Sequence, residues 1–309
     1  MNTPISMADA SADLERRFGG LRRLYGDAGY RRLRAARVAV VGLGGVGSWA
    51  AEALDRSGVA RLVLIDLDHV AESNINRQVQ ALGATLGMAK AEALRRRIAD
   101  IHPGCEVHTV EEFAGPDNWP SLLPAEVDVL IDACDQSAAK LALAAWALQT
   151  GTAAVCVGAA GGKQSAQRVE VADLAEVTHD PLLASLRQRL RKQGAPRQGR
   201  IGLACVFSRE NVAVPVAAAG GATDGVTGGA TGGATGGATG AATDAATDGT
   251  TGAATASSTD RTTDGEAGGS TDGTLNCSGY GSSVTVTATF GLVAAGEAIR
   301  QCIAARIAR

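Results

Sequence analysis

The stretch Arg37-Val-Ala-Val-Val-Gly-Leu-Gly-Gly-Val-Gly47 is an apolar run that ends in a glycine-rich turn. Such a run followed by such a turn predicts a buried strand that leads into a helix. Glycine lets a phosphate approach the backbone N–H groups of the turn and the N-terminus of the following helix. The motif therefore predicts a nucleotide site, but by itself it suits a nicotinamide cofactor as well as ATP. Its candidate binding residues are Gly42, Gly44, Gly45 and Gly47.

Short apolar runs alternate with helical patterns along the rest of the chain. We expect strands at residues 38–41, 62–65, 127–131, 153–157 and 168–171, and helices at 48–57, 90–101 and 138–149. Such alternation is typical of a doubly wound, mostly parallel α/β sheet. We therefore predict a Rossmann-like fold, preceded by one or two arginine-rich helices at about residues 16–37.

Residues 220–274 are almost wholly Gly, Ala, Thr, Asp and Ser. They carry too little apolar surface to offset the entropy lost on folding, so we predict a disordered insertion. The predicted organisation has four parts. They are a flexible N-terminus at residues 1–15, a nucleotide-binding domain at 16–219, the insertion at 220–274, and a C-terminal strand and helix at 275–309 that complete the same domain.

Composition narrows the class of protein. Hydrophobic residues make up 45% and charged residues 20% of the chain, which fits a globular protein in water. The six cysteines include no Cys-x-x-Cys pair, so we expect neither a zinc knuckle nor a disulfide framework, and a cytoplasmic location. A net charge of −3 provides no global basic field, and we do not expect DNA binding. The most apolar late stretch carries Glu297 and Arg300, so we do not expect membrane association.

A second apolar run, Leu62-Val-Leu-Ile-Asp66, ends in a carboxylate about 19 residues after Gly47. Asp66 is placed to accept hydrogen bonds from a ribose, although a carboxylate at a strand end can also cap the next turn. Asn74-Ile-Asn-Arg-Gln78 and Lys90 follow. A redox dinucleotide has no chemistry for this guanidinium and ammonium, so the pattern favours a nucleoside triphosphate that is attacked.

These segments together resemble the adenylating domain of the ubiquitin-activating-enzyme-like superfamily, which includes the ThiF, MoeB and HesA proteins. The resemblance rests on Gly42 to Gly47, Asp66-Leu-Asp68, Ser73-Asn-Ile-Asn-Arg-Gln78, Gly87-Met-Ala-Lys90 and Ala133-Cys-Asp-Gln136. It makes residues 16–219 an ATP-binding adenylating domain. It implies that a substrate carboxylate attacks the α-phosphate of MgATP, giving an acyl-adenylate and pyrophosphate.

The resemblance also implies roles for individual residues. Arg77 and Lys90 would neutralise charge on the transferring phosphates. Asn74 and Gln78 would donate hydrogen bonds to phosphate oxygens, and Asp135 would bind Mg²⁺. The relatives dimerise, so we expect a homodimer in which an arginine of the N-terminal helices reaches the ATP of the partner subunit. The two candidates for that arginine are Arg17 and Arg23.

Further segments resemble one tRNA-modifying branch of the superfamily. They are Arg17-Phe-Gly-Gly, Arg23-Leu-Tyr-Gly26, Asp180-Pro-Leu182, Cys205-Val-Phe-Ser208 and Thr285-Val-Thr-Ala-Thr-Phe-Gly291. The branch implies ATP-dependent dehydration, by cyclisation, of N6-threonylcarbamoyladenosine next to the anticodon of tRNA. Ring closure within the modification needs no protein nucleophile. A sulfur-transfer protein is a possible further partner.

Two alternatives remain open at this point. The first is adenylation of the C-terminal glycine of a ubiquitin-like or sulfur-carrier protein, and the second is a nicotinamide-dependent dehydrogenase. Two basic stretches are candidate contacts for RNA phosphates, although such runs are often solvated helix faces. They are the arginines of residues 16–37, and Arg187, Arg189, Arg191, Lys192, Arg197 and Arg200.

Overall fold

The computed structural model describes residues 13–213 and 280–304, which belong to one compact unit. Within these residues seven strands form one sheet in the order β3-β2-β1-β4-β5-β7-β6, and every neighbouring pair is parallel except β6 with β7. The predicted Rossmann-like, mostly parallel α/β fold is confirmed. The strands are β1 (Arg37–Val41), β2 (Arg61–Ile65), β3 (Glu106–Val110), β4 (Val129–Asp132), β5 (Ala153–Val157), β6 (Val169–Asp173) and β7 (Ala204–Ser208).

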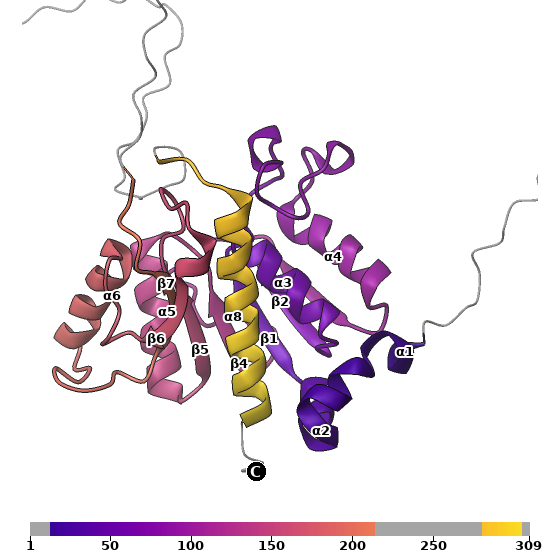
Figure 1. Ribbon diagram of the computed structural model, residues 1–309, viewed down its shortest axis with the longest axis horizontal. Helices are drawn as coiled ribbons and strands as arrows, with labels where there is room; N and C mark the ends of the chain where they lie inside the picture. Colours follow the sequence, from indigo (N-terminus) through magenta and orange to yellow (C-terminus); the bar gives the residue numbers. More distant parts are fainter. Residues whose placement is uncertain (1–12, 214–279, 305–309) are drawn as a thin grey trace, which may run out of the picture. The chain divides into compact units, whose positions relative to one another are not determined.

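Helices pack on both faces of this sheet (Figure 1). One face carries α3, α4 and α8, and the other carries α5 and α6. The α-helices are α1 (Leu14–Phe18), α2 (Gly20–Leu33), α3 (Gly47–Arg56), α4 (Lys90–Ile101), α5 (Ser137–Thr150), α6 (Pro181–Lys192) and α8 (Val284–Ala304). Three short 3₁₀ helices are η1 (Glu72–Asn74), η2 (Gly83–Thr85) and η3 (Ala166–Arg168). In the described part of the chain, no helix is long and apolar enough to cross a membrane.

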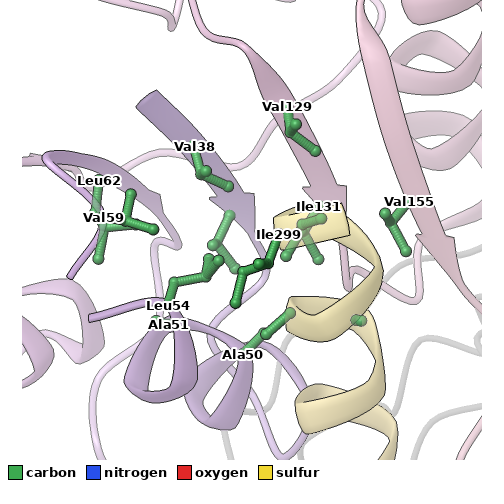
Figure 2. Packing of buried hydrophobic residues seen from close by; sticks show 14 of the residues in the cluster. Val38, Ala50, Ala51, Leu54, Val59, Leu62, Val129, Ile131, Val155 and Ile299 are labelled. Carbon is green, nitrogen blue, oxygen red and sulfur yellow. The ribbon is translucent and has the colours of Figure 1, made fainter. Parts of the chain in front are cut away.

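Alternation along the strands builds the two layers of the core. Successive strand residues point to opposite faces of a sheet, so a strand buried on both faces is apolar throughout. Val38 packs towards α3 and α8, whereas its neighbour Ala39 packs towards α5. Figure 2 shows the first of these layers, where Leu54 of α3 and Ile299 of α8 meet the strand side chains.

Helix α8 corrects the prediction for the C-terminal segment. A strand before the final helix was expected within residues 275–309, but Val284–Ala304 is one continuous helix. Val286, Phe290 and Ala294 are buried at helical spacing against the sheet and α3. Burial of this apolar stripe outweighs the weak helix propensity of valine and threonine, because propensity differences amount to only about 0.5 kcal/mol per residue.

The N-terminal boundary is also corrected. Residues 13–15 were placed in a flexible segment, but Asp13 caps α1 through a hydrogen bond from the Arg16 N–H, and α1 begins at Leu14. An aspartate in this position satisfies a free N–H group of the first helical turn. Residues 1–12 and the predicted insertion at 220–274 lie outside the described residues.

Candidate active site

A cavity of about 530 Å³ opens where β1, β2, β4 and β5 end at their carboxyl edge. The chain leaves β1 towards β2 on one side and later returns to β4 on the other side, so the cavity lies at the point where the strand order reverses. Ligands of open α/β sheets bind at such a point. The lining includes most of the site residues predicted from the sequence, namely Gly42, Gly44, Gly45, Asp66, Asn74, Arg77, Gln78, Lys90 and Asp135.

The glycine turn between β1 and α3 has a different reason for glycine at each position. Gly42 has φ +84°, and a Cβ there would lie 2.9 Å from the backbone of Ala133. A Cβ on Gly47 would collide with the carbonyl oxygen of Gly42, so Gly47 supports the turn without lining the cavity. A Cβ on Gly44 would meet no protein atom within 4 Å, although Gly44 lines the cavity. At Gly44 the open space is therefore available to a ligand.

Asp66 joins the end of β2 to the glycine turn. Its Oδ2 accepts a hydrogen bond from the Leu43 N–H at 2.6 Å, and its Oδ1 accepts one from the Asp68 N–H at 2.9 Å. Burial raises the pKa of this carboxyl, and Lys90 and the two N–H groups oppose the rise. Asp66 thus caps the turn that follows its strand and also faces the cavity. The ribose contact stays a prediction.

Lys90 lies at the start of α4 with its side chain almost fully buried, 6% exposed. Its Nζ is 2.6 Å from Oδ2 of Asp68 and 4.0 Å from Oδ1 of Asp66. Two carboxylates therefore hold the ammonium group in the wall of the cavity. The sequence analysis assigned no role to Asp68, although its place two residues after a strand-end aspartate was the available signal.

Arg77 and Asn74 are positioned by the η1 segment. The Asn74 Oδ1 accepts a hydrogen bond from the Ala71 N–H at 3.1 Å, which fixes the side chain over the turn. Arg77 donates from Nη1 to the Ser73 carbonyl at 2.8 Å and to the Asn76 Oδ1 at 2.9 Å. Both side chains line the cavity. Arg77 makes no ion pair among the described residues, so its charge is available to an anionic ligand.

Gln78 is oriented by a residue that the sequence analysis missed. Gln80 is buried and donates from Nε2 to the Leu43 carbonyl at 2.9 Å and to the Gln78 Oε1 at 3.2 Å. Because the Gln78 oxygen is already an acceptor, its NH₂ group is the part of the amide left to donate to a ligand. Gln80 therefore ties the glycine turn to the Asn-Arg-Gln block.

The opposite wall comes from the loop after β4. Asp135 is exposed to the cavity and has no hydrogen bond or ion pair to the described residues. Behind it Asp132 accepts hydrogen bonds from Lys140 Nζ at 2.9 Å and from Cys134 Sγ at 2.8 Å. Burial, with Asp132 adjacent, holds the pKa of the Cys134 thiol well above its usual value. Cys134 therefore belongs to the structural base of the loop and is no nucleophile.

Helix α8 contributes one polar group to which the sequence analysis assigned no role, although it lies in the quoted segment Thr285–Gly291. Thr287 lines the cavity, is 1% exposed, and its Oγ1 has no hydrogen-bond partner among the described residues. Its Cβ lies 3.3 Å from where a Cβ on Gly45 would be. An unpaired hydroxyl at this depth costs stability unless a ligand or water pairs with it. Thr287 therefore offers a donor to a group bound beside the glycine turn.

The N-terminal arginines do not reach the cavity of their own chain. Arg17 donates from Nη1 to the carbonyls of Asp100 and Ile101 at the C-terminus of α4, so it has a structural partner. Arg23 is exposed on α2 and has no hydrogen bond or ion pair to the described residues. Of the two candidates, Arg23 is the one that is free to contact a second subunit.

A second polar cluster lies away from the cavity, between α3 and the end of α4. Side-chain atoms of Asp55, His102 and Cys105 lie within 4.8 Å of one another. Arg34 Nη1 is 3.0 Å from His102 Nε2, and it can only donate, so the proton of the neutral ring sits on Nδ1, facing Asp55 at 3.7 Å. A metal on Nδ1 would require Nε2 to be the donor. This hydrogen-bond arrangement therefore argues against a metal ion bound by His102. Burial also raises the pKa of the Asp55 carboxyl to about 7.

Comparisons with known proteins agree with this geometry. The model of the ThiF family matches residues 17–306. The tRNA threonylcarbamoyladenosine dehydratase of Escherichia coli is 37% identical over 292 residues, which cover 93% of this chain and 94% of that protein. The enzyme of the same name from Haemophilus influenzae is 38% identical over 212 residues, 68% of this chain and 81% of that protein. A crystal structure of the E. coli dehydratase in complex with ATP superposes with a TM-score of 0.72 at 33% identity, covering 95% of this chain and 96% of that one.

Proposed function

Because the chain belongs to the ThiF family, we propose that it uses ATP to dehydrate N6-threonylcarbamoyladenosine in tRNA, next to the anticodon. The observation that carries the proposal is the extent of the similarity. Similarity to the E. coli dehydratase covers 93% of the chain, and the ThiF family match over residues 17–306 includes the C-terminal helix α8, which places Thr287 in the cavity and packs against α3. A shared nucleotide turn alone would match only the first part of the chain.

The polar groups of the cavity suit transfer of an adenylyl group. The threonyl carboxylate oxygen attacks the α-phosphorus of ATP, and the bond to the bridging oxygen breaks, so that pyrophosphate leaves. Arg77 and Lys90 neutralise negative charge on the phosphates in this step, which is worth several kcal/mol when the groups are preorganised. A nucleophilic atom of the same modification then attacks the activated acyl carbon, and AMP leaves. One water is lost from the nucleoside in total.

The residues present also fit Mg²⁺. Mg²⁺ prefers carboxylate oxygens and water, and the Asp135 carboxylate faces the cavity with no partner among the described residues. When bound, the metal neutralises phosphate charge. Asp135 would hold it, and the charge of the metal would add to that of Arg77 and Lys90, which line the same cavity.

A homodimer completes the proposal. Arg23 is exposed on α2 and has no hydrogen-bond or ion-pair partner within residues 13–213 and 280–304, which is the state expected of a residue that reaches into the cavity of a second subunit. The cytoplasm is the expected location, since the substrate is tRNA. A sulfur-transfer protein remains a possible partner.

The proposal is tested by ATP–pyrophosphate exchange. We expect exchange with tRNA that carries N6-threonylcarbamoyladenosine and none with the same tRNA lacking the modification. Exchange that depends instead on a ubiquitin-like protein with a C-terminal glycine would contradict the assigned substrate, although it would still support adenylation by this site.

A further inference from the structure

We infer that the phosphate backbone of the tRNA substrate binds in the groove along the exposed face of α6. The inference rests on the proposed function and locates the surface that holds the substrate. The groove has a volume of about 710 Å³ and is lined by Pro181, Ser185, Gln188, Arg191, Lys192 and Arg197, among others.

The charge of this surface is of one sign. Residues 181–202 contain six basic side chains and no acidic one. The apolar residues of α6, including Leu183, Leu186 and Leu190, face the core. Among the basic residues of the helix, Lys192 is exposed and Arg191 is half-buried, whereas Arg187 and Arg189 are half-buried and donate hydrogen bonds to protein carbonyls. The whole chain, by contrast, carries a net charge of −3. A local basic surface on an acidic protein is a feature of polyanion recognition.

Two of these cations have no structural partner. Lys192 and Arg197 are exposed and form no hydrogen bond or ion pair with the described residues. Arg191 donates only a 3.3 Å hydrogen bond from Nε to the Pro196 carbonyl, so its Nη atoms remain available. Phosphate contacts would therefore cost no interaction within the protein.

Like the α6 stretch, in which Arg187 and Arg189 donate to protein carbonyls, the other basic stretch contains arginines with structural partners. Arg32 donates to the Ile303 carbonyl, Arg34 donates to the Gly58 carbonyl, and Arg37 forms an ion pair with Asp128. These arginines hold the N-terminal helices and β1 in place. Arg16, Arg23 and Arg31 of that stretch are exposed and form no side-chain hydrogen bond or ion pair with the described residues. What favours the α6 stretch as the main RNA surface is therefore that its cations line a groove and that no acidic residue lies among them.

The groove begins at the wall of the ATP cavity. Asp180 caps α6 by accepting from the Leu183 N–H at 2.9 Å, and it also accepts from the Ala159 N–H at 2.8 Å. Ala159 and Leu182 line the cavity, whereas Pro181 lines the groove. From Pro181 to Lys192 the helix is about 17 Å long. The basic face therefore starts next to the cavity that takes the carboxylate, within reach of the phosphates that neighbour the modified nucleotide.

The test compares two double variants of the full chain that lose the same charge. In Lys192→Gln/Arg197→Gln the groove loses its two unpaired cations. The control, Arg95→Gln/Arg96→Gln, changes exposed arginines of α4 that pair with Glu92. Helix α4 packs on the other face of the sheet from α6 and lies at the opposite end of the view in Figure 1. Binding of tRNA carrying N6-threonylcarbamoyladenosine is measured by fluorescence anisotropy between about 50 and 200 mM salt.

We expect the groove variant to bind tRNA about five- to twentyfold more weakly and to lower the slope of log K against log salt by about 1.5, since each lost phosphate contact contributes about 0.7–0.9. Its KM for tRNA rises, and its ATP affinity is unchanged. Equal tRNA affinity in the groove variant and the wild type, or equal weakening in the control, overturns the inference. Unchanged tRNA binding with loss of a protein ligand from the groove variant also overturns it. A wild type that binds tRNA without dehydrating it contradicts only the proposed function.

Discussion

Replacement of Gly291 by alanine tests how α8 packs on the nucleotide-binding half of the fold. Gly291 lies in the middle of α8, and a Cβ there would lie 2.8 Å from Trp49 Cβ and 3.0 Å from the Ala50 nitrogen. The carbonyl oxygen of Val46, the residue before α3, would lie closer still. These are mostly backbone atoms of the helix that follows the glycine turn, so they cannot rotate away.

The expected magnitude follows from two opposing terms. Overpacking against a close-packed core costs about 1–3 kcal/mol, and contact with backbone favours the upper end. Alanine is about 1 kcal/mol better than glycine inside a helix. The net loss is therefore about 2 kcal/mol, or about 4–8 °C in melting temperature for a chain of this size.

Gly296→Ala is the matched control in the same helix. A Cβ on Gly296 would meet no atom within 4 Å, so only the propensity term applies. We expect a gain of about 0.5–1 kcal/mol. Thermal unfolding and ATP titration of both variants are the assays, with weaker ATP binding expected only for Gly291→Ala because α3 shifts. A Gly291→Ala protein as stable as Gly296→Ala would refute the close packing of α8 on α3.

Three further changes separate the chemistry of the site from its architecture. Arg77→Ala and Asp135→Ala should each reduce ATP–pyrophosphate exchange at least about 100-fold, with melting temperatures near that of the wild type. Near-normal exchange in either variant would contradict the role assigned to the residue that it replaces. Gly44→Ala should weaken ATP binding at least about tenfold, whereas Gly83→Ala, which also has open space for a Cβ, should not change it. Asp55→Asn should stabilise the protein, and urea unfolding should show that this gain grows by about 2 kcal/mol from pH 5 to pH 8. The reason is that the pKa of the buried carboxyl is raised from 3.8 to about 7, so the wild type loses stability as the pH rises through that range, whereas the asparagine variant does not. A gain that does not depend on pH would mean that Asp55 does not titrate in this range.

Local patterns predicted much of the fold because several elements need no distant partner to be recognised. The helix expected at residues 90–101 and the strand at 153–157 agree with α4 and β5 at both ends. Strand β3 was missed because Glu106, His108 and Thr109 make this edge strand polar. Strand β7 was also missed, although it is apolar.

The candidate site was predicted to the extent that its residues belong to motifs. The structure brings the glycine turn, Asp66, the Asn-Arg-Gln block, Lys90 and Asp135 around one cavity. Gln80, which orients Gln78, was not predictable because it acts through the carbonyl of Leu43, a segment distant in the sequence. Thr287 enters the cavity from the other end of the chain, beside Gly45. Arg23 cannot be tested within a single chain, since its proposed partner is a second subunit.

The most direct test of the account is mass spectrometry of the nucleosides of tRNA that carries N6-threonylcarbamoyladenosine, after incubation with the protein and MgATP. We expect the modified nucleoside to lose the mass of one water, with one AMP released for each nucleoside converted. An unchanged nucleoside, in a preparation that binds ATP, would contradict the assigned reaction.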